Sequence, residues 1–151
     1  MHHQRILALD VGDARVGVAL SDPLGISAQP LCTIEQKGAQ TFSKILDLVR
    51  EHAVATIVVG FPYELDGSIG EQARQVERFC ARLRQAVADA ALADGVRIEP
   101  FDERFTTQQA ERTLVGSKLK NKERSAAIDR VAAALILEGY LLRIAGRGSS
   151  F

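Results

Sequence analysis

The pattern of hydrophobic and polar positions predicts strands before any helix. Residues 6–12 and 16–20 are almost uniformly apolar, and the short polar segment between them has the character of a tight turn, so together they predict a hairpin. Residues 26–34 are compatible with a third strand, and Pro30 within this segment indicates a position at or near a sheet edge. Three strands are therefore expected in the first part of the chain.

From residue 39 onward the pattern alternates between helix and strand. Helical periodicity predicts an amphipathic helix over residues 39–52, and the β-branched run 56–60 is typical of a central parallel strand covered on both faces. Ser68 and Glu71 have the spacing of a capping box, which predicts the start of a long helix with Cys80 on its buried face. These segments predict helices packed against a sheet.

The C-terminal third continues the alternation. Its expected segments are a strand at 96–101, a short helix towards Leu114, a basic loop at 116–124, an apolar helix at 126–143 and a loose tail at 144–151. The last helix is expected to bury a stripe that includes Ile128, Leu135 and Leu142. The element order predicts one domain over residues 1–151 with an α/β ribonuclease-H-like fold, in which helices flank a mixed five-stranded sheet. Several families share this fold, so topology alone does not define the chemistry.

Composition limits the possible functions only broadly. The chain has 151 residues, with Lys plus Arg equal to Asp plus Glu at 19 each, so any electropositive surface must be local. Cys32 and Cys80 have no metal-binding spacing and are expected to be reduced thiols. We find no signal peptide and no apolar run near the roughly 20 residues of a membrane span, so a cytoplasmic location is expected.

Asp10 is the acid that most clearly needs a functional explanation, because it interrupts an apolar strand and a buried charge is costly unless it is compensated. Glu103 follows the fifth predicted strand, and Asp129 lies in the first turns of the last helix. Three clustered carboxylates would repel one another unless Mg²⁺ or Mn²⁺ compensated them, and two such ions can promote phosphodiester hydrolysis. The simpler alternatives are that Asp129 only complements the helix dipole and that Glu103 pairs with Arg104.

Basic residues precede the helix that carries Asp129. This loop is either a solvated segment or a phosphate-binding element beside the acids. Its basic residues are Lys118, Lys120, Lys122 and Arg124.

Four blocks of the sequence, in the same order, resemble the YqgF family, also called RuvX. The resemblance runs over nearly the whole chain and rests on the combination of blocks. The blocks are Asp10-Val11-Gly12 with Arg15-Val16-Gly17, Val59-Gly60-Phe61-Pro62, Asp102-Glu103-Arg104-Phe105-Thr106-Thr107, and Asp129-Arg130-Val131-Ala132.

The resemblance implies a nuclease that processes the 5′ end of pre-16S ribosomal RNA, which is a structured RNA. The implied cofactor is Mg²⁺ or Mn²⁺, bound as two ions. It implies that the catalytic, metal-binding acids are Asp10, Glu103 and Asp129, and it leaves open whether Asp102 is an auxiliary ligand. Phosphate contacts are expected from Arg15, Arg104, Arg130 and the basic loop.

Other functions fit the same sequence. A Holliday-junction-type resolvase of branched DNA would use the same acids. An RNA-binding factor in ribosome assembly would need no catalysis, and an actin-like ATP-binding protein would use the Asp10 hairpin for phosphate. The sequence leaves the oligomeric state open between monomer and homodimer.

Overall fold

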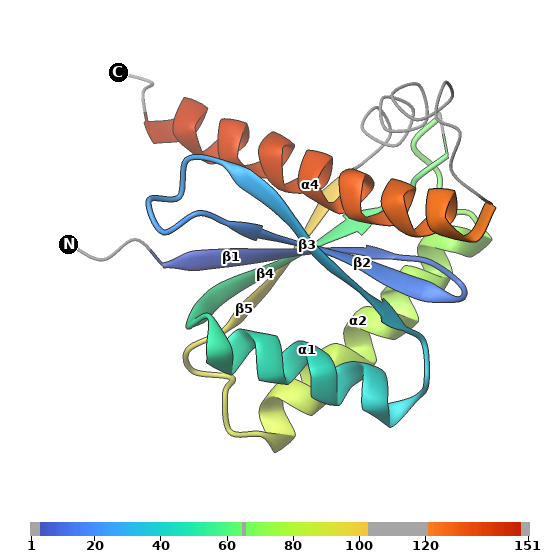
Figure 1. Cartoon of the computed structure of the whole chain (residues 1–151), viewed down its shortest axis with the longest axis horizontal. Coiled ribbons are helices and arrows are strands. Elements are labelled where there is room, and N and C mark those ends of the chain that lie inside the picture. Colours follow the sequence, from blue (N-terminus) through green and yellow to red (C-terminus); the bar gives the residue numbers. More distant parts are fainter. Residues whose placement is uncertain (1–3, 65, 103–120, 149–151) are drawn as a thin grey trace.

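The computed structural model describes residues 4–64, 66–102 and 121–148 of the chain. Figure 1 shows a central sheet with helices on both faces. The elements are β1 (Arg5–Val11), β2 (Arg15–Ser21), β3 (Ala28–Glu35), α1 (Ala39–Glu51), β4 (Val54–Phe61), α2 (Glu71–Asp89), β5 (Arg97–Asp102) and α4 (Asn121–Gly148).

The five strands form one mixed sheet in the order β3-β2-β1-β4-β5. The first three strands are antiparallel, whereas β4 runs parallel to both β1 and β5. This arrangement confirms the predicted mixed sheet, with β1 at its centre and the strand that contains Pro30 at its edge. The parallel pair follows from the crossover helices α1 and α2, which return the chain to the same end of the sheet.

Alternation along the strands divides the core into two layers. Leu7 and Leu9 of β1 face α1 and α2, while Ile6 and Ala8 face α4. The layer beneath α4 includes three alanines on the sheet side, Ala8, Ala19 and Ala28, which let this helix approach closely. The other layer is filled by larger side chains, with Phe42 and Phe79 in ring contact at 4.9 Å between centroids.

The start of α2 differs from the prediction. Its N-cap is Gly70, without a side-chain capping bond, so the predicted capping box at Ser68 is wrong. Ser68 instead donates its backbone N–H to the Asp66 carboxylate at 2.9 Å, a local turn contact that competes with capping.

The last helix is longer than predicted and buries a different face. α4 includes residues 121–124, which were assigned to the basic loop, and residues 144–148, which were assigned to the tail. Leu142 is 74% exposed, contrary to the prediction, and Ile128 and Leu135 are only half-buried. The face against the sheet is formed by Ala132, Ala133, Ala134, Ile136, Leu137, Tyr140 and Leu141.

Both cysteines are free thiols, as predicted, with Cys80 buried and Cys32 half-buried. Burial raises the pKa of the Cys80 thiol to about 11, which makes it a poor nucleophile at neutral pH. None of the described helices is long and apolar enough to cross a lipid bilayer.

Candidate active site

Asp10 lies near the end of the central strand, on the face of the sheet that α4 covers. It is half-buried and stands directly opposite Gly17 of β2 in the antiparallel register. Directly opposed residues share one face, so the missing side chain of Gly17 leaves space beside the Asp10 carboxylate. This position confirms the predicted placement of Asp10 at the end of a central strand, beside a hairpin.

The space above Gly17 is occupied by the backbone of α4. A Cβ atom at Gly17 would lie 2.1 Å from the carbonyl oxygen of Asp129, a distance that no real Cβ contact permits. A glycine within a strand often marks such a close backbone approach. Gly17 therefore brings the helix down onto the sheet at the level of Asp10, and Asp129 with it.

Asp129 affects the ionisation of Asp10. Burial, and to a smaller extent the negative charge of Asp129, raise the pKa of Asp10 from its usual 3.8 to about 7. Both effects disfavour the ionised form, because the charge loses solvent and faces a like charge. At neutral pH the pair therefore has a strong preference for a compensating proton or cation.

Arg15 supplies one such positive charge. Its Nε donates to Oδ2 of Asp129 at 2.9 Å, and the two side chains are only 25% and 22% exposed, so solvent screens this ion pair less than a surface pair. Arg15 begins β2 directly after the hairpin turn, which is closed by a bond from the Gly12 N–H to the Arg15 carbonyl oxygen at 2.8 Å.

Gln36, which the sequence did not single out, also fixes the hairpin. Its side-chain amide donates to the Gly12 carbonyl oxygen at 3.1 Å, and its backbone N–H donates to the Ala14 carbonyl oxygen at 2.9 Å. Gln36 follows β3, so these bonds tie the end of the edge strand to the tip that separates Asp10 from Arg15. No local sequence pattern indicates this contact, because it depends on the pairing of β2 with β3.

The remaining predicted residues have different outcomes. Nη1 of Arg130 lies 3.4 Å from the Thr33 hydroxyl, and Thr33 pairs with Gly17, so this guanidinium lies over β3 on the α4 side of the sheet. Lys122 and Arg124 belong to the first turns of α4 rather than to a loop. Four predicted residues lie outside the described part of the chain. They are Glu103, Arg104, Lys118 and Lys120.

The described residues therefore bring together two of the three predicted acids. No group of three His, Cys, Asp or Glu side chains suited to a metal ion occurs within residues 4–64, 66–102 and 127–146. Asp102 ends β5 and is half-buried. The arrangement around Asp10 provides two oxygen ligands, which is a partial set for a hard divalent cation.

Similar proteins identify the family. The family described as RuvX, Holliday junction resolvase, matches residues 4–143. A relative from Halalkalibacterium halodurans, named "Putative pre-16S rRNA nuclease", is 44% identical over 142 residues, which cover 92% of this chain and 96% of the relative. A relative of the same name from Moorella thermoacetica is 43% identical over 145 residues, which cover 95% and 99% of the two chains.

Among solved structures, RuvC of Thermus thermophilus in complex with a Holliday junction has a TM-score of 0.55 at 17% identity, covering 94% of this chain and 96% of RuvC. A second structure of RuvC from the same organism has a TM-score of 0.54 at 14% identity, covering 94% of this chain and 97% of that one. At these identities the likeness concerns the fold, which confirms the predicted ribonuclease-H-like architecture. The family match and the relatives at more than 40% identity go further: this chain belongs to the RuvX family.

Proposed function

We propose that this protein is a metal-dependent endonuclease of structured RNA that processes the 5′ end of pre-16S ribosomal RNA. The observation that carries the proposal is the pairing of Asp10 and Asp129 at the end of the central strand, where burial and mutual repulsion create a demand for positive charge. The names of the relatives supply the substrate class.

The donor set fits Mg²⁺ or Mn²⁺, as one ion or two. Carboxylate oxygens are the ligands that these hard cations prefer, and a divalent ion would offset the burial and the repulsion by Asp129 that together raise the pKa of Asp10. Arg15 already pairs with Asp129, so a cation at Asp10 would add to an existing pattern of charge compensation. The chemistry that such ions supply is stabilisation of the negative charge that develops on the scissile phosphate.

Glu103 is the proposed third ligand. Along β5, Glu99 accepts a hydrogen bond from Tyr140 of α4, and Phe101 packs into the layer beneath the same helix. Strand alternation then assigns Asp102 to the opposite face, away from Asp10. This argument favours Glu103, the next residue in the chain, over Asp102.

The protein residues have separate roles in the proposed reaction. Asp10 and Asp129 would hold the cation, and Arg15 orients Asp129 through its Nε and is proposed to contact a phosphate through its Nη groups. Arg130, whose Nη1 donates to the Thr33 hydroxyl over β3, is proposed to contact the substrate backbone on the same face. Arg104, Lys118, Lys120, Lys122 and Arg124 are proposed as further phosphate contacts that give salt-dependent affinity.

A second candidate is cleavage of branched DNA. It is favoured by the description of the family as a Holliday junction resolvase and by the fold shared with RuvC. The same acids would serve both reactions, so only the substrate distinguishes them.

The test is cleavage of a 5′-extended pre-16S fragment and of a four-way DNA junction by the purified protein with Mg²⁺ or Mn²⁺. We expect cleavage of the RNA, loss of activity in Asp10→Asn, and retained activity in the matched Asp94→Asn variant, whose acid is exposed beyond the end of α2. Preferential cleavage of the junction would support the second candidate. RNA binding without cleavage of either substrate, or full activity in Asp10→Asn, would overturn the nuclease proposal.

A further inference from the structure

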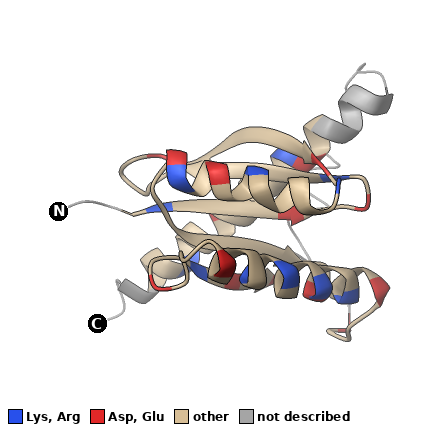
Figure 2. Cartoon of the chain, turned by 90° about the horizontal axis from the view of Figure 1, so that it is seen from below, with Lys and Arg blue, Asp and Glu red and all other residues tan. Residues whose placement is uncertain are grey.

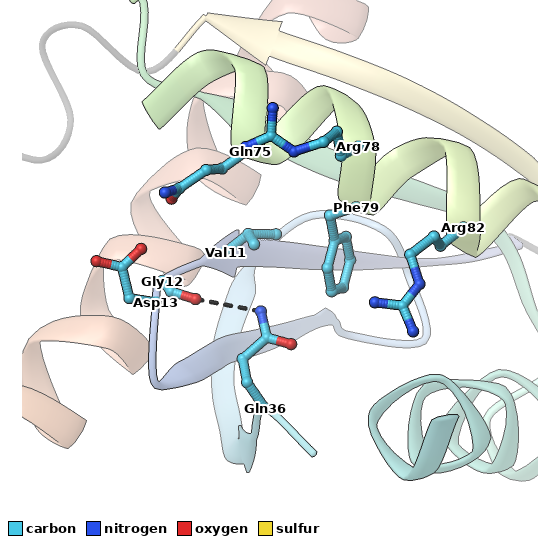
Figure 3. A pocket seen from close by; sticks show the side chains of 8 residues that line it. All are labelled: Val11, Gly12, Asp13, Gln36, Gln75, Arg78, Phe79 and Arg82. Carbon is cyan, nitrogen blue, oxygen red and sulfur yellow. Dashed lines mark hydrogen bonds between the residues drawn. The ribbon is translucent and has the colours of Figure 1, made fainter. Parts of the chain in front are cut away.

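A pocket opens on the other face of the sheet at the same end as Asp10. Its volume is about 300 Å³, and it lies between the β1–β2 hairpin and one stripe of α2 (Figure 3). The residues that line it are Val11, Gly12, Asp13, Gln36, Gln75, Arg78, Phe79 and Arg82.

The α2 side of the pocket follows from helical spacing. Gln75, Arg78, Phe79 and Arg82 stand at positions i, i+3, i+4 and i+7, so they share one face of the helix. Phe79 is 6% exposed and forms an apolar floor, whereas both arginines are exposed. Figure 2 shows the recurrent basic positions along this helix, on the side of the molecule opposite α4.

Neither arginine is strongly engaged elsewhere within the described chain. Arg78 pairs with Glu71 at 3.1 Å, but these side chains are 63% and 68% exposed, so exchanging this partner for a phosphate costs little. The guanidinium of Arg82 lies 4.8 Å from the centroid of the Phe42 ring, a stacking contact that orients its plane and leaves N–H donors at its edges.

The hairpin side of the pocket supplies a different chemistry. Gln36 is fixed by its bond to the Gly12 carbonyl oxygen, and Asp13 places an exposed carboxylate at the opposite end from Arg82 (Figure 3). A bare inorganic anion gains nothing from a carboxylate. A nucleotide suits this mixture, because it combines a phosphate with ribose hydroxyls and base edges that donate and accept hydrogen bonds.

The pocket and the acid site are linked through the chain. Val11, Gly12 and Asp13 follow Asp10 directly, so the two sites flank one hairpin on opposite faces. A strand of nucleic acid that leaves Asp10 around this end of the sheet reaches the pocket next.

We propose that this pocket binds a nucleotide of the substrate RNA strand beyond the cleaved bond. Arg78 and Arg82 hold its phosphate, and Gln36, Gln75 and Asp13 contact its ribose and base. The assignment rests on the proposed function as an RNA nuclease and adds a binding site outside the cleavage centre.

The test measures RNA binding by the full chain with Asp10→Asn included in every protein to prevent cleavage. Arg78→Gln/Arg82→Gln is compared with Arg50→Gln/Arg84→Gln, which removes the same charge from exposed positions outside the pocket. Loss of two phosphate contacts to single-stranded RNA lowers the slope of log affinity against log salt by about 1.4. An increase from 50 to 200 mM salt then weakens binding about sevenfold less in the pocket variant than in its parent, while the control keeps the parental slope.

The outcomes separate the two proposals. If the parent protein does not bind RNA, both the proposed function and the pocket assignment fail. If the parent binds but pocket and control variants have equal slopes, only the pocket assignment fails. Free AMP serves as a second probe because it carries a phosphate, a ribose and a base. Competition with RNA that is lost in the pocket variant supports the assignment, and competition that the pocket variant retains counts against it. Circular dichroism of each variant confirms that these surface changes leave the fold intact.

Discussion

Replacing Asp10 with asparagine should stabilise the metal-free protein in a pH-dependent manner. The folded chain keeps a proton on Asp10 up to about pH 7, whereas the unfolded chain loses it near pH 4. The folded state therefore binds more protons between these values, and the free energy of unfolding falls as the pH rises. The free energy of unfolding falls by about 1.4 kcal/mol per pH unit over this range, so the ionised Asp10 destabilises the folded state by about 4 kcal/mol at pH 8.

Asparagine has no such proton equilibrium, so the advantage of Asp10→Asn should grow by about 3 kcal/mol between pH 5 and pH 8. Urea unfolding in EDTA at these two pH values measures the difference, with m-values compared to confirm the same unfolding transition. Asp13→Asn provides the same chemical change at the exposed hairpin tip. An advantage for Asp10→Asn that is equal at both pH values, or larger at pH 5, would refute the reasoning about burial and repulsion.

Three further predictions follow from the geometry of the site and of α4. Gly17→Ala should destabilise the fold by about 1–3 kcal/mol or displace α4, because the new Cβ meets the backbone of Asp129. Gly139→Ala should be milder, because its Cβ meets only the tip of the Phe101 ring, 2.7 Å away. Equal losses of stability in chemical unfolding would contradict this. Leu137→Ala should lower the free energy of unfolding by about 2–5 kcal/mol, and Leu142→Ala should lower it by less than about 0.5 kcal/mol. The reverse order would support the buried stripe predicted from the sequence. Calorimetric affinity for Mn²⁺ should be about fivefold weaker at pH 6 than at pH 7, because the metal must displace the proton of Asp10; equal affinities would argue against Asp10 as a ligand.

The sequence predicts the sheet and Asp10 well, because their signals are local. An acid within an apolar strand, followed by a short turn and a second apolar run, indicates both the hairpin and an unusual side-chain environment. The local pattern alone therefore predicts the hairpin and the position of Asp10 within it. The proximity of Asp129 to Asp10 also agrees with the expectation that these acids cluster.

The errors concern features that tertiary packing decides. The residues of α4 from 131 to 137 are all apolar, so periodicity does not identify the buried face, and the small residues of β1 and β2 determine which alanines approach the sheet. The capping box failed because Ser68 bonds within its own turn through Asp66. The ion pair between Arg15 and Asp129 joins residues 114 positions apart, which no spacing rule could indicate.

The hairpin around Gly12 has a consequence for insertions and deletions. Three residues of the two paired strands serve the site. Asp10 is one of the acids, Arg15 pairs with Asp129, and Gly17 leaves the space into which α4 packs. A strand register shifted by one residue turns every side chain to the opposite face of the sheet. A single residue inserted between Asp10 and Gly12, with the rest of β1 kept in register, would change what the turn presents to Asp129 while leaving most of the core intact. An insertion or deletion at this turn can therefore abolish the acid site while the protein still folds.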